Sequence, residues 1–306
     1  MALTDKLTAI ADAIRTKTGT SDTMTLDEMA TAVGNISGDG ETTTVTTDSA
    51  DAVIDKSITE YSSDTLTSIG EYAFYYCSSL TSVDTPNVAS IGTEAFYYCT
   101  NLADIDLSSV TSIGTQAFYN CKALTNLTLT NVTSLGVSAF QSCTELTIVS
   151  IPGITTLASS VFQGCIGLSG IDLSNVTSIG SKAFYNCYFL GNVDISNAES
   201  IGDSAFYYCT AITSFDLSAC TELNTKAFWY CTGLTKVWIP STCTTISASS
   251  YSYSPFYKCS STLEIYTDVA DEDSIPEGWG TCWNYYGSSG TLTVHYGATH
   301  DEYEAA

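Results

Sequence analysis

One stretch decides the fold of this chain: residues 168–187 read LSGIDLSNVTSIGSKAFYNC. Ile171 and Leu173 flank Asp172, which is the alternation expected of a short strand with one buried face. Val176 continues the apolar set beyond the strand. The stretch therefore predicts a strand and a following turn whose apolar side chains share one core.

The second half of the same stretch predicts a short helical turn. Gly180 permits a bend. Ala183, Phe184 and Cys187 follow at positions i, i+1 and i+4, which share one face of a helix. One such unit cannot bury its apolar face alone. Copies of it must stack, so that columns of equivalent side chains form one continuous core.

Copies of the unit recur every 22 residues. Seven of eight consecutive copies contain the dipeptide Ala-Phe and the other contains Val161-Phe162, and a cysteine follows each Phe by three residues. A ninth copy, with Phe256 and Cys259, arrives 28 residues after the eighth. The eight cysteines in register are Cys77, Cys99, Cys121, Cys143, Cys165, Cys187, Cys209 and Cys231.

The pattern Leu-x-x-Ile-x-Leu-x-x-Val-x-x-Ile-Gly-x-x-Ala-Phe-x-x-Cys closely resembles the BspA-like leucine-rich repeats, over roughly residues 63–266. The resemblance implies a leucine-rich-repeat solenoid with a short parallel β-strand and a short helical turn in each rung. Such proteins are common on the surfaces of gut and oral bacteria and in some of their phages. They mostly bind surfaces or matrix, without one shared site.

Outside the repeats the sequence predicts a leader, a linker, and a C-terminal cap and tail. The aromatic residues Trp279 and Trp283 are suited to cover the last rung, which would otherwise expose its core. Asp301 to Ala306 is expected to be a frayed tail. The expected division is a helical leader (1–36), a linker (37–50), the solenoid (51–266) and a C-terminal cap and tail (267–306).

The leader is different in kind from the repeats. Leu3, Leu7, Ile10 and Ile14 follow helical spacing, and a second short helix begins near Leu26. This helix-turn-helix segment resembles leaders on structural and tail proteins of phages that infect Firmicutes. The resemblance implies that the leader docks to virion proteins. Because tail fibres are often trimers, it also implies a homo-oligomer, although no heptad pattern supports one.

Charge narrows the range of partners. The 33 acidic and 9 basic residues give a formal net charge of −24. We therefore expect no binding to nucleic acid and none to an anionic membrane surface, because both depend on Lys and Arg. The first residues show no signal peptide and no segment spans a membrane, so we expect a chain made and kept in a cytoplasm.

Of the twelve cysteines, those of the repeat ladder are expected to be buried free thiols. Nine occupy one repeat position and Cys220 falls in a column of Val, Ile and Ala, so ten belong to the core. Only Cys243 and Cys282 lie outside this pattern. No Cys-x-x-Cys is present, and a linear ladder does not suit tetrahedral zinc.

Two rows of equivalent residues are candidate binding surfaces. The first row, here called the acidic row, lies between the buried strand positions: Asp84, Asp106, Asp172, Asp194, Asp216 and Trp238. Neighbouring strands are about 4.8 Å apart, so these carboxylates repel one another. Either the row is a solvated face that resists aggregation, or it holds Ca²⁺. No other cofactor is expected.

The second row, here called the aromatic row, follows the buried Phe column: Tyr75, Tyr97, Tyr119, Tyr185, Tyr207, Tyr208, Trp229 and Tyr230. Exposed Tyr and Trp favour recognition, because they bring a large contact area with a polar group. The alternative is that these rings lie over the gaps between rungs and seal the stack. Both interpretations stay open.

We expect a binding protein and not an enzyme. The chain has two histidines, His295 and His300, both near its end, and no catalytic motif. The favoured function is a phage tail-fibre or receptor-binding component, located in the virion, that recognises a host surface protein or glycan. The alternatives are a BspA-like adhesin on a bacterial cell surface and a purely structural virion or decoration protein.

Overall fold

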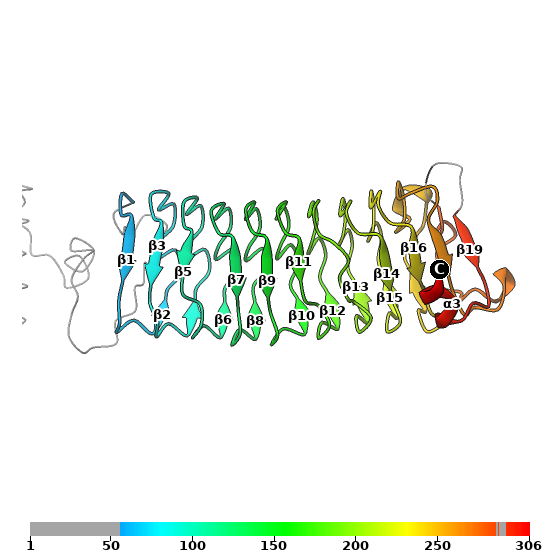
Figure 1. Ribbon diagram of the computed structural model, residues 1–306, viewed down its shortest axis with the longest axis horizontal. Helices are drawn as coiled ribbons and strands as arrows, with labels where there is room; N and C mark the ends of the chain where they lie inside the picture. Colours follow the sequence, from blue (N-terminus) through cyan, green and yellow to red (C-terminus); the bar gives the residue numbers. More distant parts are fainter. Residues whose placement is uncertain (1–55, 286, 288–291) are drawn as a thin grey trace, which may run out of the picture.

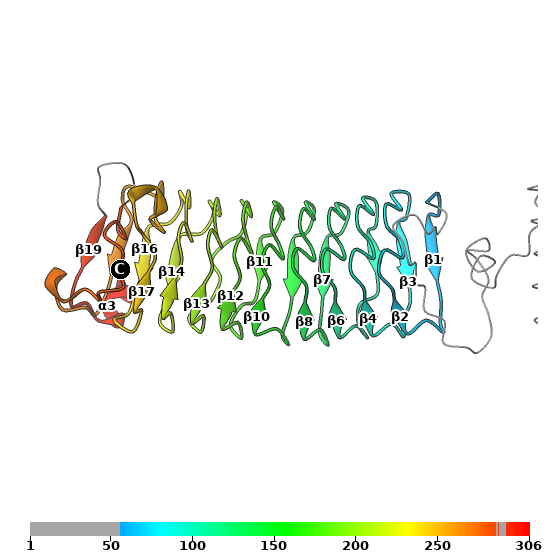
Figure 2. The same cartoon turned by 180° about the vertical axis from the view of Figure 1, so that it is seen from behind.

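The computed structural model describes residues 56–285, 287 and 292–306. The predicted leader and linker lie outside the described residues. The repeats stack along one axis, with the N-terminal rungs at one end and the C-terminal cap at the other (Figure 1). The view from behind shows the same order of rungs (Figure 2). The predicted leucine-rich-repeat solenoid is confirmed.

Each rung contributes up to two short strands, and every pairing between named strands is parallel. The first strands of the rungs, which carry the acidic row, are β1 (Glu60–Ser62), β3 (Ser82–Asp84), β5 (Asp104–Ile105), β7 (Asn126–Thr128), β9 (Ile148–Ser150), β11 (Gly170–Ile171), β14 (Ser214–Asp216), β16 (Lys236–Trp238), β18 (Glu264–Tyr266) and β19 (Thr293–His295). The second strands are β2 (Ser68–Ile69), β4 (Ser90–Ile91), β6 (Ser112–Ile113), β8 (Ser134–Leu135), β10 (Thr156–Leu157), β12 (Ser178–Ile179), β13 (Ser200–Ile201), β15 (Glu222–Leu223) and β17 (Thr245–Ile246).

The remaining elements lie in the last third of the chain. They are the 3-10 helices η1 (Tyr251–Tyr253) and η2 (Glu272–Ser274) and the helix α3 (His300–Ala305). In the described part of the chain, no helix has the length and apolar character needed to cross a bilayer.

The Ala-Phe segment is a run of turns and not the predicted helical turn. Two residues in each complete 22-residue rung are left-handed, as Lys182 (φ 58°) and Asn186 (φ 63°) show. This alternation points backbone groups out of the rung: the Lys182, Phe184 and Asn186 N–H groups donate to carbonyls of the next rung at 2.8–2.9 Å. The segment therefore adds a third ladder of hydrogen bonds between rungs.

The predicted Phe and Cys columns form the core. Phe74 to Phe256 are fully buried, and successive rings lie 5.0–5.8 Å apart and nearly parallel. The thiol of Cys121 donates to the carbonyl of Phe96 at 3.1 Å, and the other ladder cysteines from Cys99 to Cys259 repeat this bond at 3.0–3.2 Å. All twelve cysteines are free, as predicted for those of the ladder, and all except Cys282 are buried.

The C-terminal cap is confirmed and the frayed tail is wrong. Trp279 and Trp283 are buried against the last rung. Residues 300–305 form α3, which begins with a capping box between Thr299 and Glu302. Its Tyr303 is only 3 % exposed, because the ring packs beside Trp238 and Tyr266 on the first strands. This apolar anchor, which no local pattern reveals, orders the end of the chain.

A glycine at the bend is expected to be irreplaceable. A Cβ on Gly114 would lie 2.6 Å from the backbone carbon of Gly92 in the preceding rung, whereas nothing lies within 4 Å of a Cβ on Gly170. Gly114→Ala should lower the free energy of unfolding by about 1–3 kcal/mol or more. Gly170→Ala is the matched control and should change it little. Equal effects in urea denaturation would contradict this close stacking.

Stability should fall at alkaline pH because of the column of buried cysteine thiols, here called the thiol ladder. Burial raises the pKa of the ladder cysteines, that of Cys165 to about 12. Unfolded thiols ionise from about pH 8.5 while the folded ones keep their protons, so the unfolded state is favoured above that pH. Each thiol should contribute a loss of about 1.4 kcal/mol per pH unit.

The check is urea denaturation under reducing conditions between pH 7 and 10. The contribution of the thiols to the free energy of unfolding should hardly change with pH below about pH 8. Above that pH the free energy of unfolding should fall steeply. Replacing one ladder thiol, in Cys165→Ala, should reduce that slope by about 1.4 kcal/mol per pH unit. A curve that stays flat to pH 10 would contradict the protonated ladder.

Candidate functional site

The aromatic row forms two separate stacks. Tyr97 lies 5.1 Å from Tyr75 and 4.8 Å from Tyr119, with ring planes 14–15° apart. The second stack runs from Tyr185 through Tyr207 and Trp229 to Tyr257, with centroids 4.5–4.9 Å apart. Gln141 and Gln163 occupy the same column between the two stacks. Within each stack, therefore, most ring faces contact one another and the half-buried rings leave mainly edges to solvent.

A parallel pair of rings flanks each stack. Tyr76 stacks on Tyr98 at 4.9 Å and Tyr208 on Tyr230 at 4.5 Å, and all four residues are left-handed, with φ between 57° and 63°. Left-handed backbone costs a residue with a Cβ about 1–2 kcal/mol, and each ring pair returns about 0.5–1.5 kcal/mol. Stacked rings of this kind stabilise the contact between rungs, and because they are half-buried they also offer a surface to a partner. The geometry is thus compatible with both interpretations of the aromatic row, as a seal between rungs and as a recognition surface.

The tyrosine hydroxyls remain hydrogen-bond donors. Desolvation, reinforced by neighbouring tyrosines, raises the pKa of Tyr97 to about 12. The same causes raise the pKa of Tyr207 and Tyr208. The edge of the solenoid therefore presents protonated hydroxyls over the whole physiological pH range.

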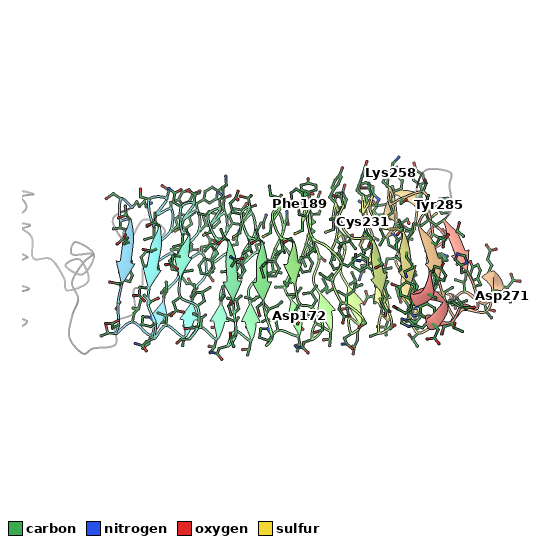
Figure 3. The ribbon with its side chains drawn as sticks, viewed as in Figure 1. Asp172, Phe189, Cys231, Lys258, Asp271 and Tyr285 are labelled. Carbon is green, nitrogen blue, oxygen red and sulfur yellow. The ribbon has the colours of Figure 1, made fainter. Side chains whose placement is uncertain are left out.

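An exposed apolar cluster, here called the Phe189 cluster, adjoins the second stack. Phe189 is 66 % exposed, and Tyr188 and Ile166 are 37 % and 39 % exposed. Tyr188 lies 6.1 Å from Tyr208, which joins the cluster to the aromatic row. Figure 3 shows Phe189 and Lys258 along one long edge of the solenoid and Asp172 toward the other. Large exposed apolar side chains gathered in this way are typical of binding surfaces.

Sequence reasoning missed the Phe189 cluster although a signal was available. In the column of Tyr188 and Ile166 the other rungs carry Ser78, Thr100, Lys122, Thr144, Thr210, Thr232 and Ser260. In the column of Phe189 they carry Ser79, Asn101, Ala123, Glu145, Gly167, Ala211, Gly233 and Ser261. The cluster is marked by large apolar residues at positions where the other rungs carry small or polar ones.

Lysines and carboxylates share the turn segments of the same edge, where Glu71, Glu94, Glu145 and Asp203 also lie. Six lysines fall within the described residues, and four of them lie in the turn segments: Lys122, Lys182, Lys226 and Lys258. Lys226 sits over Trp229 at 5.3 Å and over Tyr253 at 4.8 Å, and Lys258 over Tyr257 at 5.5 Å. On a chain with a net charge of −24, Lys226 and Lys258 place cations against the aromatic rings of this edge.

The acidic row has a local structural role. The carboxylates of Asp106, Asp172, Asp194 and Asp216 each accept a hydrogen bond at 2.8–3.0 Å from the backbone N–H two residues ahead. These Asx turns lie at or just beyond the first strand in the rungs of Asp106, Asp172 and Asp216, and Asp194 makes the same turn in a rung without a first strand. The bond from the Ser174 N–H lowers the pKa of Asp172. Local turns thus account for acidic residues in this column, and Asp84 completes the row at the end of β3.

Helix α3 covers the end of the acidic row. Trp238, predicted to be on the surface, is only 5 % exposed, because His300 and Tyr303 of α3 pack on its ring. Asp216 meets the His300 ring at 2.9 Å. Of the predicted row, Asp84, Asp106, Asp172 and Asp194 remain exposed. Trp238 therefore anchors the cap and cannot contact a partner while α3 stays in place.

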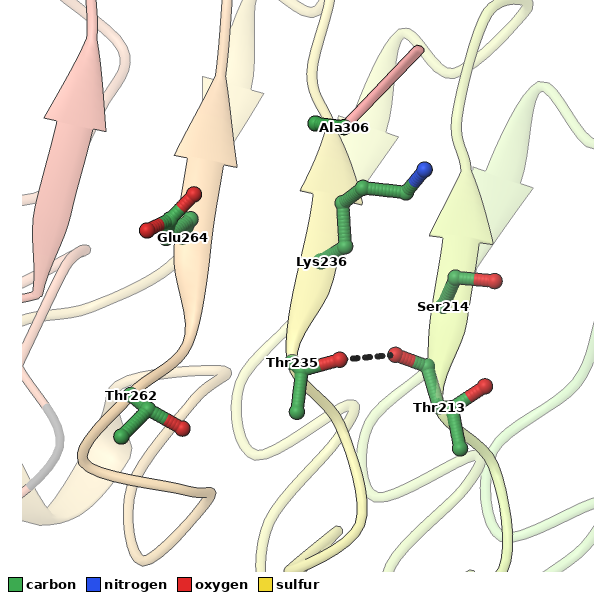
Figure 4. Close-up of a pocket in the computed structure, with 7 residues that line it drawn as sticks. All are labelled: Thr213, Ser214, Thr235, Lys236, Thr262, Glu264 and Ala306. Carbon is green, nitrogen blue, oxygen red and sulfur yellow. Dashed lines mark hydrogen bonds between the residues drawn. The ribbon is translucent and has the colours of Figure 1, made fainter. Parts of the chain in front are cut away.

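A hollow of about 410 Å³ opens beside Ala306, the residue that follows α3 (Figure 4). It is lined by Thr213, Ser214, Thr235, Lys236, Thr262, Glu264 and Ala306. The Lys236 ammonium already donates to the Tyr303 carbonyl at 2.8 Å and lies 4.5 Å from the Tyr303 ring. The one cation lining the hollow is thus engaged by α3, and the remaining hydroxyl groups show no convergent geometry.

Two substitutions compare the effect on stability of losing a stacked ring with that of losing an exposed one. Tyr97→Ser removes two ring stacks and should lower the free energy of unfolding by about 1–3 kcal/mol. Phe189→Ser removes an exposed side chain and should change it by no more than about 0.5 kcal/mol. Thermal or urea denaturation of the two variants checks this. A large loss in Phe189→Ser would mean that Phe189 is packed and unavailable to a partner.

Comparison with known proteins agrees with this geometry. The family model described as the BspA type leucine-rich repeat region matches residues 55–169 and 133–261. The repeat architecture also resembles a solved leucine-rich repeat protein from Bacteroides ovatus, with 29 % identity and a TM-score of 0.54, over 66 % of this chain and 59 % of that one. The chain thus spans less than two thirds of that protein's length.

Two other solved structures are more distant in shape. A leucine-rich repeat protein from T. pallidum is 31 % identical over 43 % of this chain and 64 % of that one, with a TM-score of 0.41. A leucine rich cell surface protein from Faecalibacterium prausnitzii is 22 % identical over 81 % of both chains, with a TM-score of 0.34. No curated protein sequence matches the chain. Because the family model covers more than half of its residues, the chain belongs to the BspA-type leucine-rich repeat family.

Proposed function

We propose that this protein is a non-catalytic binding protein that attaches to a cell surface through the solenoid edge that carries the aromatic row. The observation that carries the proposal is the Phe189 cluster, with a two-thirds exposed Phe beside stacked tyrosines. Rigid aromatic side chains bury area at low entropic cost and dominate the energy of many interfaces.

The edge suggests the chemistry of its partner. Phe189, Tyr188 and Ile166 supply apolar area, while the tyrosine hydroxyls and Lys226 supply donors and positive charge. A surface protein or glycan that combines apolar faces with oxygen acceptors complements this set. Because the chain as a whole is strongly acidic, Lys226 and the tyrosine hydroxyls are the groups of this edge that would attract oxygen acceptors of the partner.

Two carriers of this binding function are supported by different observations. The leader of residues 1–36 resembles those of phage tail proteins, which favours a virion component that recognises a bacterial host. Membership of the BspA-type family favours an adhesin on a bacterial cell surface. The solenoid edge would serve either carrier, since both need a surface-binding repeat domain joined to a separate attachment segment.

The binding test uses the labelled full chain on two panels, one of gut bacteria and one of animal epithelial cells. We expect saturable binding that falls at least about tenfold in Phe189→Ser and Tyr188→Ser, because each removes exposed contact area. The matched control is Ile148→Ser on β9, which removes a side chain of similar exposure, 58 %, from the sheet face.

The outcomes distinguish the alternatives. Binding confined to bacteria favours the virion component, and binding to animal cells favours the adhesin. Loss of binding in Ile148→Ser but not in Phe189→Ser would move the contact to the sheet face. No saturable binding on either panel would overturn attachment to cells and leave a structural role in an assembly.

A further inference from the structure

The two histidines of the chain lie on the sheet face at its C-terminal end. Nε2 of His300 is 2.9 Å from Oδ2 of Asp216 and 4.0 Å from Oε1 of Glu304. The donor atoms of these three residues all lie within 4.8 Å of one another. In the described part of the chain, this is the one group of three or more His, Cys, Asp or Glu side chains close enough to share an ion.

The fold positions each of the three donors separately. Oδ1 of Asp216 accepts hydrogen bonds from the Ser218 N–H at 3.0 Å and from the Ser218 hydroxyl at 2.5 Å, which leaves Oδ2 to face His300. His300 and Glu304 are four residues apart on α3 and so share one face of the helix.

Helix α3 is itself fixed in place. Its capping box defines the first turn, the buried Tyr303 anchors it, and Lys236 donates to the Tyr303 carbonyl. The His300 ring meets Trp238 edge-on at 5.2 Å. Donors held by such surrounding contacts are preorganised for a ligand.

We propose that Asp216, His300 and Glu304 bind a divalent transition-metal ion, with Zn²⁺ as the best fit. One imidazole nitrogen and two carboxylate oxygens are ordinary zinc ligands, at about 2.0–2.2 Å from the metal. An ion between Nε2 and Oδ2 replaces their direct hydrogen bond, and water fills the open position. Ca²⁺ is disfavoured because it takes six or more oxygen ligands.

The second histidine provides the contrast. His295 lies 3.4 Å from Glu264, but no third donor joins this pair within the described residues. His295 also stacks on Tyr266 at 4.4 Å, which fixes its ring much as Trp238 fixes His300. His295 is therefore a matched control: a histidine beside a carboxylate on the same face, without the third ligand.

Metal binding would staple the C-terminal helix to the solenoid. Asp216 ends β14, and His300 lies 84 residues further along the chain. An ion that joins them adds a bond across the contact that keeps Trp238 covered. Because the three donors meet only in the folded chain, binding has to be measured well below the unfolding temperature, where the thiols of the core stay buried and cannot compete for the ion.

The test is calorimetric titration of the metal-free, reduced full chain with ZnCl₂. All proteins carry Cys282→Ser, which removes the one cysteine that is not buried. We expect one Zn²⁺ per chain in this parent and in His295→Ala, with binding weaker by about tenfold or more in His300→Ala and Glu304→Gln.

Glu304→Gln keeps the test decisive if His300→Ala disturbs α3, because the Glu304 side chain is largely exposed. Unchanged zinc affinity in both variants, or no saturable binding by the parent, would overturn the site. Displacement of Zn²⁺ by an equal concentration of Ca²⁺ would overturn the assigned class of metal. Equal weakening in His295→Ala would show that surface histidine, and not this group of three, binds the ion.

Discussion

The structure depends on backbone hydrogen bonds that leave each rung and end in the next one. Three ladders do this: the first strands, the second strands and the left-handed turns, where the Phe184 N–H donates to the Ala205 carbonyl at 2.8 Å. Adjacent strands lie about 4.8 Å apart, so every side chain must tolerate an equivalent neighbour at that distance. A rung that departs from the shared path would leave buried donors without acceptors.

This constraint explains why each column carries its kind of residue. Phe rings stack at about their contact distance, and each ladder thiol from Cys99 onward reaches the Phe carbonyl of the rung before it. Carboxylates are the difficult case, because like charges repel across neighbouring strands. Asp172 and Asp194 are accommodated because each accepts a hydrogen bond from its own turn, at 3.0 Å. Packing between equivalent residues thus limits which side chains a column can hold, and only side chains within that limit are available for surface chemistry.

Candidate functional positions in such a solenoid are therefore those whose residue type differs from that of the equivalent positions in the other rungs. Phe189 and Ile166 replace small or polar residues, and Trp238 replaces an acidic one. The first two create an exposed apolar cluster, and the third creates the surface on which α3 docks. An aromatic residue in a polar column thus gives an exposed apolar cluster in one place and a covered cap in another. Which of the two results depends on whether another part of the chain reaches it.

The sequence by itself determined the rung length, the core columns, the free thiols and the aromatic cap, because each repeats or follows local apolar spacing. It did not reveal the left-handed turns, since most of those positions hold Tyr, Lys, Ser, Glu or Gln, which rarely adopt a positive φ, and only Asn120, Asn186 and Gly164 favour one. It also misplaced Trp238 and the last six residues. Those depend on the packing of Tyr303 in α3 against Trp238, which lies far earlier in the chain. Only the tertiary structure brings such distant segments together, because stacking of the intervening rungs sets where the chain returns.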